Sequence, residues 1–172
     1  MMKLVKLTKN LEKQYYDFLR EWKEAGEEII PYSVSREFST IEEAIETFEN
    51  ESKGINIGDF VSSSTYVAYE EDDDCIVGAV HIRHCLNEKL LFDGGHIGDG
   101  VRPSRRNKGY ATEMIKQALK ICREELDLEK VLMCCYKDNI ASRKSIIKNG
   151  GILENEVISK KGKVVQRYWI KT

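Results

Sequence analysis

The chain has 172 residues, and its 41% of hydrophobic residues is enough to build one domain around a core. Charged residues make up 33% but almost cancel, and the net charge of −2 argues against nucleic acid or an anionic membrane as a partner. The five cysteines form no C-x-x-C pair and mostly sit in apolar runs, so we expect reduced core residues. The chain opens without a signal peptide or membrane span, and we therefore expect a cytoplasmic protein.

Hydrophobic periodicity predicts alternating strands and helices along the chain. Apolar residues recur at helical spacing over 11–24, where Ala25-Gly26 ends the helix, and Thr40 with Glu43 forms a capping box for a second helix. Two β-rich runs flank an acidic turn at 71–74 and predict a hairpin. The strands are expected at 4–7, 65–70, 75–85, 95–101, 131–136, 152–159 and 164–170, and the helices at 11–24, 41–48, 111–122 and 139–149.

This order of elements predicts an α/β fold with a mixed, mainly antiparallel sheet that is flanked by helices on both faces. No internal repeat, low-complexity tract or linker interrupts the pattern, so we expect a single domain over residues 1–172. The apolar final strand at 164–170 could pair edge to edge with another subunit, and a homodimer is therefore one of the expected states.

The most informative stretch is the loop that follows Val101 and leads into the next helix. A helix N-terminus exposes unpaired backbone N–H groups and the positive end of the helix dipole, so a loop of small residues there makes a phosphate site. Gly109 allows close approach of the backbone, while Arg105, Arg106 and Lys108 add cations that suit a diphosphate better than a single carboxylate. A solvated basic turn before an ordinary amphipathic helix is the alternative interpretation.

Two segments of the chain resemble the GNAT superfamily of N-acetyltransferases. Residues 106–111, Arg-Asn-Lys-Gly-Tyr-Ala, are similar to the family's Arg/Gln-x-x-Gly-x-Gly/Ala signature, and Val101-x-Pro103 resembles the strand exit before it. Residues 139–142 and 148–151 resemble the later segment that closes the CoA arm. A helix and a strand separate the two segments, as in the family, so the resemblance in element order covers nearly the whole chain. The runs at 94–98 and 167–170 look like a bacterial branch of predicted acetyltransferases.

The resemblance implies binding of acetyl-CoA without a metal. Backbone amides of residues 106–111 would hold the pyrophosphate, and the main chain at Val101 would bind the pantetheine. Asn139 would contact the pantetheine or the thioester, although a helix N-cap explains an Asn there equally well. The residues expected to bind the cofactor are Val101, Arg106, Asn107, Lys108, Gly109, Tyr110, Ala111, Asn139, Ser142 and Lys148.

The catalytic residues are less clearly marked. Acetyl transfer to an amine needs a deprotonated nucleophile, a stabilised oxyanion and a proton for the departing thiolate. Many members of the family carry a Tyr seven residues after the Asn to protonate the sulfur, and here that position is Ile146. Tyr136, Tyr168 or a water could take its place, or the thiolate could leave without assistance.

The candidate bases lie on the central strands. Period-two alternation makes Asp99 the best-placed carboxylate on the strand at 95–101, while His84 on the strand before it could relay a proton near neutral pH. A structural role is the alternative for each histidine. A metal site of His81, His84 and His96 is disfavoured because their faces alternate and no carboxylate or cysteine completes it.

We therefore predict that acetyl-CoA donates an acetyl group to a primary amine of a small molecule or peptide, by direct attack in a ternary complex. Glu27 and Glu28 before Pro31 could attract the amine, although solvated surface charges explain them as well. A non-catalytic acyl-CoA sensor is the second hypothesis, since it would keep the phosphate loop and lose the chemistry. A small kinase is disfavoured because no Gly-x-x-x-x-Gly-Lys-Ser/Thr occurs.

Overall fold

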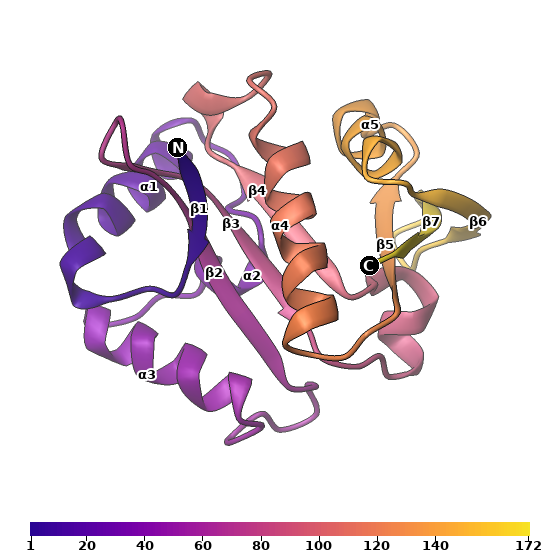
Figure 1. Ribbon diagram of the computed structural model, residues 1–172, viewed down its shortest axis with the longest axis horizontal. Helices are drawn as coiled ribbons and strands as arrows, with labels where there is room; N and C mark the ends of the chain where they lie inside the picture. The colour runs from indigo at the N-terminus through magenta and orange to yellow at the C-terminus, as the bar shows by residue number, and fades with distance from the viewer.

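A computed structural model of residues 1–172 shows two antiparallel sheets side by side, with helices packed against them (Figure 1). The first sheet has the order β1-β2-β3-β4 and the second has the order β5-β7-β6. The strands are β1 at Met2–Val5, β2 at Ser63–Glu70, β3 at Cys75–Arg83, β4 at Ile97–Val101, β5 at Lys130–Tyr136, β6 at Ile152–Ile158 and β7 at Val164–Lys171.

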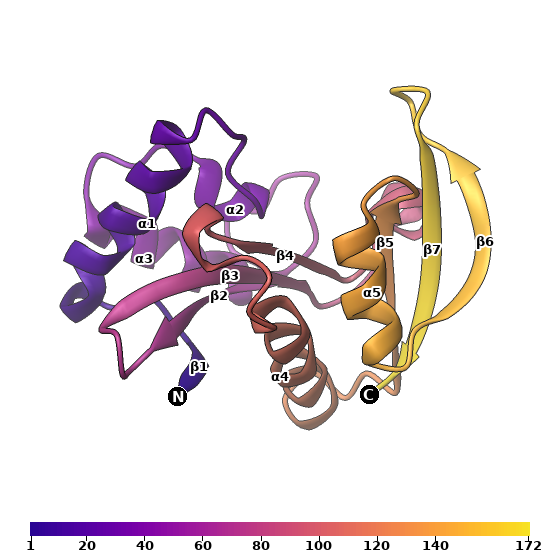
Figure 2. The same cartoon turned by 90° about the horizontal axis from the view of Figure 1, so that it is seen from above.

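Helices cover both faces of the first sheet. Helices α1, α2 and α3 lie on one face and α4 lies on the other, while α5 stands between the first sheet and β5 (Figure 2). Short turns of other helical types complete the chain. The helices are α1 at Glu12–Glu24, α2 at Tyr32–Ser35, α3 at Ile41–Ser52, α4 at Tyr110–Glu124 and α5 at Ile140–Lys148, and the turns are η1 at Lys9–Leu11, η2 at Leu90–Gly94 and η3 at Pro103–Arg105.

Two hydrophobic cores lie on opposite faces of the first sheet. One core packs α1 and α3 against residues such as Val67 and Ala79, and the other packs α4 against residues such as Val80. Because both faces of β2 and β3 are covered, these strands are buried along most of their length, with little alternation between buried and exposed positions. The α4 core also contains Met133 of β5 and Tyr168 of β7, so one helix holds the two sheets together.

The predicted fold class and the predicted order of elements are confirmed. Thr40 caps α3, because its hydroxyl oxygen accepts the Glu43 N–H at 3.2 Å. In a capping box the Glu43 carboxylate would accept the N–H of Thr40, and here it accepts the N–H of Ser39, one residue earlier, at 2.7 Å. Helix α2 and the π-helical turn η2 lie in segments for which the sequence predicted no regular structure. The expectation of a free edge at the last strand is wrong, because β7 pairs on both sides and β6 forms the edge.

All five cysteines are free thiols. Cys122 and Cys135 are buried, as expected, whereas Cys75 and Cys134 are half-buried and Cys85 is exposed. None of the helices combines the length and the apolar surface that crossing a bilayer requires.

The two sheets meet at a joint formed by His96 and Leu132. The His96 N–H donates to Leu132 O at 2.7 Å, and the Leu132 N–H donates to Nδ1 of the His96 ring at 2.9 Å. Gly95 precedes this joint at φ +72°, and a Cβ there would lie 2.6 Å from Leu132 O, so glycine is required twice over. Burial, with Arg83 nearby, lowers the pKa of His96 to about 4, which keeps the ring neutral with its proton on Nε2.

Candidate functional site

Beyond the joint the sheets separate, and a cleft of about 730 Å³ lies between β4, the start of α4 and one side of α5. The loop between α1 and α2 closes its far end. Its lining residues are Trp22, Glu27, Glu28, Ile30, Asp99, Gly100, Val101, Arg105, Arg106, Asn107, Gly109, Tyr110, Ala111, Thr112, Asn139, Ala141, Ser142, Lys144, Ser145 and Lys148. Most of the residues expected to bind a cofactor are therefore brought together at one place.

The main chain of β4 is open toward the cleft. In the register of β4 with β3, Gly98 and Gly100 occupy the hydrogen-bonded positions, so the N–H and C=O groups of Asp99 and Val101 point away from β3. The Val101 carbonyl accepts a hydrogen bond from Arg106 Nε at 3.2 Å. The N–H groups of Asp99 and Val101 remain available to an extended ligand.

The loop before α4 presents unpaired backbone donors. Asn107 and Gly109 both have left-handed backbone conformations, at φ +62° and +86°. The first intrahelical bond of α4 runs from the Glu113 N–H to Gly109 O at 3.1 Å, so the N–H groups of the first turn have no partner within the protein. A Cβ at Gly109 would meet nothing within 4 Å, which shows that the space in front of these donors is open. Such an arrangement suits a phosphate or diphosphate.

Glu21 of α1 anchors the same loop from the other side. Its carboxylate accepts hydrogen bonds from the Ser104 N–H at 2.7 Å and the Ser104 hydroxyl at 3.0 Å, and it also pairs with Arg102. Burial opposes ionisation of Glu21, but these hydrogen bonds hold its pKa below the ordinary value. A contact more than 80 positions apart in sequence thus fixes the loop, and no local pattern predicts it.

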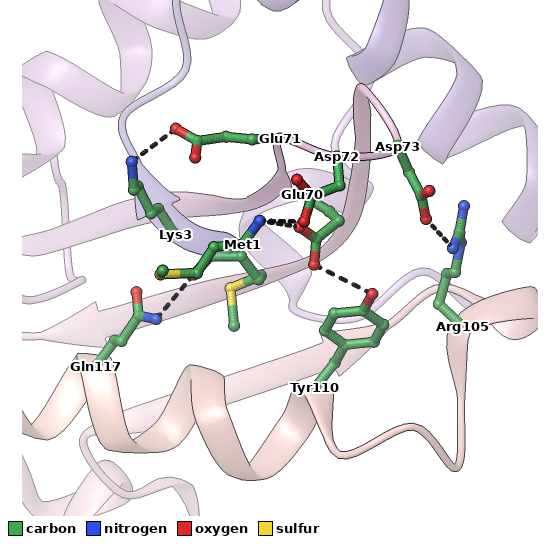
Figure 3. Close-up of polar contacts among 10 residues, drawn as sticks. Met1, Lys3, Glu70, Glu71, Asp72, Asp73, Arg105, Tyr110 and Gln117 are labelled. Carbon is green, nitrogen blue, oxygen red and sulfur yellow. Dashed lines mark hydrogen bonds and ion pairs between the residues drawn. The ribbon is translucent and has the colours of Figure 1, made fainter.

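The cations of the loop are mostly engaged by carboxylates. Arg105 pairs with Asp73 of the β2–β3 turn at 2.5 Å, and Arg106 pairs with Glu27 at 2.6 Å, whereas Lys108 has no ion-pair partner. Figure 3 shows Arg105 reaching Asp73, with the Tyr110 hydroxyl pointing to Glu70 in the same corner. The sequence predicted three cations directed at phosphates, and the structure leaves only one of them unpaired.

Helix α5 forms the opposite wall of the cleft. Asn139 is its N-cap, because the carboxamide oxygen accepts the Ser142 N–H at 3.1 Å, and the structural interpretation of this residue is confirmed. Lys148 lines the cleft as well, together with Lys144 and Ser145, which the sequence did not single out. They lie one helical turn from Ser142 and Lys148, so helical periodicity could have found them.

Asp99 is the only expected catalytic residue that lines the cleft. Its side chain is half-buried and makes no hydrogen bond or ion pair. Burial raises the pKa of Asp99 to about 6, since no cation compensates its charge. An unpartnered carboxyl with this pKa is a suitable general base near neutral pH.

The structure places the other three expected catalytic residues away from the cleft. His84 Nε2 lies 2.8 Å from the hydroxyl of Ser64 at the start of β2. Tyr168 is buried in the core and donates to Gln166 Oε1 at 2.8 Å. Tyr136 is 36% exposed, and Lys163 lies 4.9 Å from its ring centroid. Strand alternation shows which residues share a face of a sheet, but not which face borders the cleft. Both faces of these sheets meet other parts of the protein, so the sequence could not place these three side chains.

Three further residues that the sequence analysis considered also lie outside the cleft. Ile146, at the position of the family's tyrosine, is fully buried in the α4 core and offers no hydroxyl. His81 bonds the Thr65 hydroxyl at 3.1 Å and His96 bonds Leu132, so the three histidines have three different partners. No group of three or more His, Cys, Asp or Glu side chains is arranged to hold a metal ion.

Comparison with known sequences gives the family. Residues 7–152 match the acetyltransferase (GNAT) domain family. The N-acetyltransferase YnaD of Bacillus subtilis (strain 168), itself uncharacterised, is 28% identical over 109 residues. That match covers 63% of this chain and 58% of YnaD, so the chain spans little more than half the length of its curated relative.

Solved structures share the fold over 99% of this chain. The microcin C7 self-immunity acetyltransferase MccE, in complex with acetyl-CoA and AMP, has a TM-score of 0.70 at 13% identity over 92% of its chain. A GNAT-family acetyltransferase from Bacillus anthracis has a TM-score of 0.67 at 19% identity over 94%. Mutant forms of the spermidine/spermine N-acetyltransferase SpeG from Vibrio cholerae reach 0.65 at 14% identity over 95%. The family match covers most of the sequence, and it agrees with the two separated sheets and the open helix N-terminus at the cleft. The chain therefore belongs to the GNAT family of N-acetyltransferases.

Proposed function

We propose that the protein transfers the acetyl group of acetyl-CoA to a primary amine by direct attack in a ternary complex, with residues 1–172 acting as one domain. The observation that carries the proposal is the cleft itself. One end presents the unpaired N–H groups at the start of α4, and the other end holds the unpaired carboxyl of Asp99. An anion site and a base within one cleft are what acyl transfer from a phosphorylated carrier requires.

Acetyl-CoA would supply an activated thioester, and the chain supplies the means to hold it. The N–H groups of Gly109, Tyr110 and Ala111 would bind the pyrophosphate. The main-chain N–H groups of Asp99 and Val101 would bind the amides of the pantetheine. Of the remaining cofactor candidates, Asn107 would shape the loop, and Lys108, Lys148, Asn139 and Ser142 would bind phosphates and the CoA arm. That one structural neighbour was solved with acetyl-CoA supports this assignment.

Asp99 would accept the proton of the attacking amine. With a pKa of about 6 it is largely ionised at neutral pH and is still a stronger base than an ordinary aspartate. Neither Tyr136 nor Tyr168 lines the cleft, and the hydroxyl of Tyr110 donates to Glu70 at 3.3 Å, so we assign protonation of the thiolate to water. An acyl-CoA sensor is the second candidate function, because the buried Ile146 favours loss of the chemistry.

The acceptor end of the cleft is acidic. Glu28 and Asp99 have no cationic partner there, while Lys144 and Lys148 lie at the cofactor end. This separation of charge favours an amine that arrives as a cation, either a small molecule or the amino group of a peptide. The spermidine/spermine acetyltransferase among the structural neighbours acts on acceptors of this class.

Calorimetric titration of acetyl-CoA into the wild type and Gly109→Asp tests the cofactor site. The aspartate places a negative charge where the pyrophosphate should bind, so affinity should fall at least 100-fold, by about 3 kcal/mol. Gly150→Asp is a matched control, since Gly150 shares φ +86° and open surroundings but lies outside the cleft.

CoA release with a panel of amines then separates the two candidate functions. Turnover that disappears in Asp99→Asn supports the enzyme. Binding without turnover on any amine supports the sensor, and absence of binding to the wild type contradicts both.

A further inference from the structure

The side chain of Arg106 contacts the loop that follows α1, whereas its backbone belongs to the loop before α4. Its Nη1 and Nη2 donate to the two oxygens of Glu27 at 3.0 and 2.6 Å, and its Nε donates to Val101 O. The guanidinium also lies over the ring of Trp22, 5.0 Å from the centroid. Three of the five N–H donors are engaged, and the two that remain do not lie side by side, so the side chain has no edge left for bidentate binding of a phosphate.

Glu27 begins the loop that closes the acceptor end. The N–H groups of Glu28, Ile29 and Ile30 donate no hydrogen bond within the protein, and Glu28 and Ile30 are exposed. The loop is therefore held by few contacts of its own, and the bidentate pair with Arg106 is its polar attachment to the cofactor side.

The same loop lies directly on β4. A Cβ at Gly100 would come within 2.2 Å of Ile30 O, and a Cβ at Gly98 would touch Pro31 at 3.7 Å. Gly98 and Gly100 flank Asp99 on the strand. A shift of the loop would thus change the space around Asp99, where the acceptor amine has to approach.

The buried ring of Trp22 packs beneath the Arg106–Glu27 ion pair. It is 2% exposed, it lines the cleft, and its indole Nε1 has no hydrogen-bond partner. Because Arg106 stacks on a buried ring, a small displacement of the Arg106 backbone has to be passed on to Glu27 rather than absorbed by a swinging side chain.

We propose that Arg106 and Glu27 are positioning residues that couple the two ends of the cleft: anion binding at the backbone of residues 106–111 fixes Arg106, which through Glu27 orders the acceptor loop at 27–31. The inference rests on the proposed cofactor site. It assigns the Arg106 side chain to the acceptor end and leaves the phosphates to the backbone and the lysines.

Hydrogen exchange of the loop measures this coupling without a known acceptor. Saturating acetyl-CoA should slow exchange at Glu28, Ile29 and Ile30 in the wild type by about fivefold or more, the lower end of ordinary coupling between sites. Glu27→Gln and Arg106→Gln should each abolish most of this slowing. The family's signature admits Gln at position 106, so the loop backbone should tolerate that change.

Two neighbouring variants serve as matched controls. Arg105→Gln removes the same charge from the same loop but breaks the pair with Asp73, and Glu28→Gln removes a carboxylate that has no partner. Both should keep the protection seen in the wild type. The double variant Glu27→Gln/Arg106→Gln should resemble each single variant, because only one interaction is lost.

Calorimetry on the same samples keeps the two proposals distinguishable. If acetyl-CoA does not bind the wild type, the proposed function fails and the coupling fails with it. If acetyl-CoA binds but exchange at 28–30 is unchanged, or is slowed equally in Glu27→Gln, the coupling alone is overturned.

Discussion

The two ends of the cleft are built in different ways. The backbone donors of the proposed cofactor end come from one continuous stretch, the loop and first turn that join β4 to α4, and α5 faces them across the cleft. The acceptor end combines Trp22 of α1, the loop at 27–31 and Asp99 of β4, which meet only in the folded chain. Residues that are neighbours in the sequence form a motif that can be recognised there, whereas residues that come from separate elements do not.

This contrast explains why the sequence carries a recognisable family signature for the cofactor end and none for the acceptor end. Backbone donors at a helix N-terminus need little more than a glycine and a helix, and many side chains are compatible with them. The acceptor end depends on side chains that each fold can vary independently. Changes at the two ends should therefore have separable effects.

The largest separable effect is expected at Asp99. Asp99→Asn should lower kcat/KM about 100-fold or more through loss of the base, while acetyl-CoA affinity measured by calorimetry stays within about twofold. In the wild type the rate should fall as the pH drops through about 6, because Asp99 becomes protonated there. A variant that keeps this acidic limb, or that loses cofactor affinity to the same extent, would assign the base elsewhere.

His96 tests whether both ends depend on the joint between the sheets. His96→Leu leaves the Leu132 N–H buried without an acceptor and should lower the free energy of unfolding by about 2–3 kcal/mol, whereas His96→Asn offers an oxygen in place of Nδ1 and should cost less. Urea denaturation measures the difference.

His96 should also make the stability of the protein depend on pH in a definite direction. Since the folded-state pKa of His96 is depressed to about 4, its contribution is fully present above pH 6.5 and is lost as the pH falls toward 4. His96→Asn should flatten that part of the profile. An unchanged slope between pH 6.5 and 4 would contradict the neutral-ring assignment.

The smallest effect compares two glycines, one at each end. Gly100→Ala places a methyl group against Ile30 O and should displace the acceptor loop, whereas Gly109→Ala meets open space and costs only the strain of φ +86°, about 1 kcal/mol. We expect Gly100→Ala to reduce turnover more than acetyl-CoA affinity, and Gly109→Ala to do the reverse. Steady-state kinetics with calorimetry distinguishes the two outcomes.

Much of the fold followed from local signals. The capping residues Thr40 and Asn139, the Ala25-Gly26 stop and the acidic hairpin turn each act within a few positions, and the elements they delimit lie where periodicity predicted them. The division of the strands into two sheets was not predicted, because it depends on His96 meeting Leu132, 36 positions away.

The site divides in the same way. The loop at 106–111 was proposed from its own residues and Asp99 from the alternation of one short strand, and both line the cleft. The ion pairs of Arg102, Arg105 and Arg106 reach Glu21, Asp73 and Glu27 on other elements, so the sequence could not show that their charges are largely compensated. His84, Tyr136 and Tyr168 were chosen for their chemistry, which says nothing about the face to which a strand turns them.

The joint also creates two strand edges inside the molecule. An exposed edge normally invites another polypeptide to add itself to the sheet. Here the free edge of β4 faces the cleft, and α5 forms the opposite wall, so the edge lies in a hollow of about 730 Å³ that could receive a thin, extended molecule with peptide-like amide groups. Such a molecule would pair with the free N–H groups of Asp99 and Val101 as an added strand does, by the same β-augmentation that joins peptides to sheets.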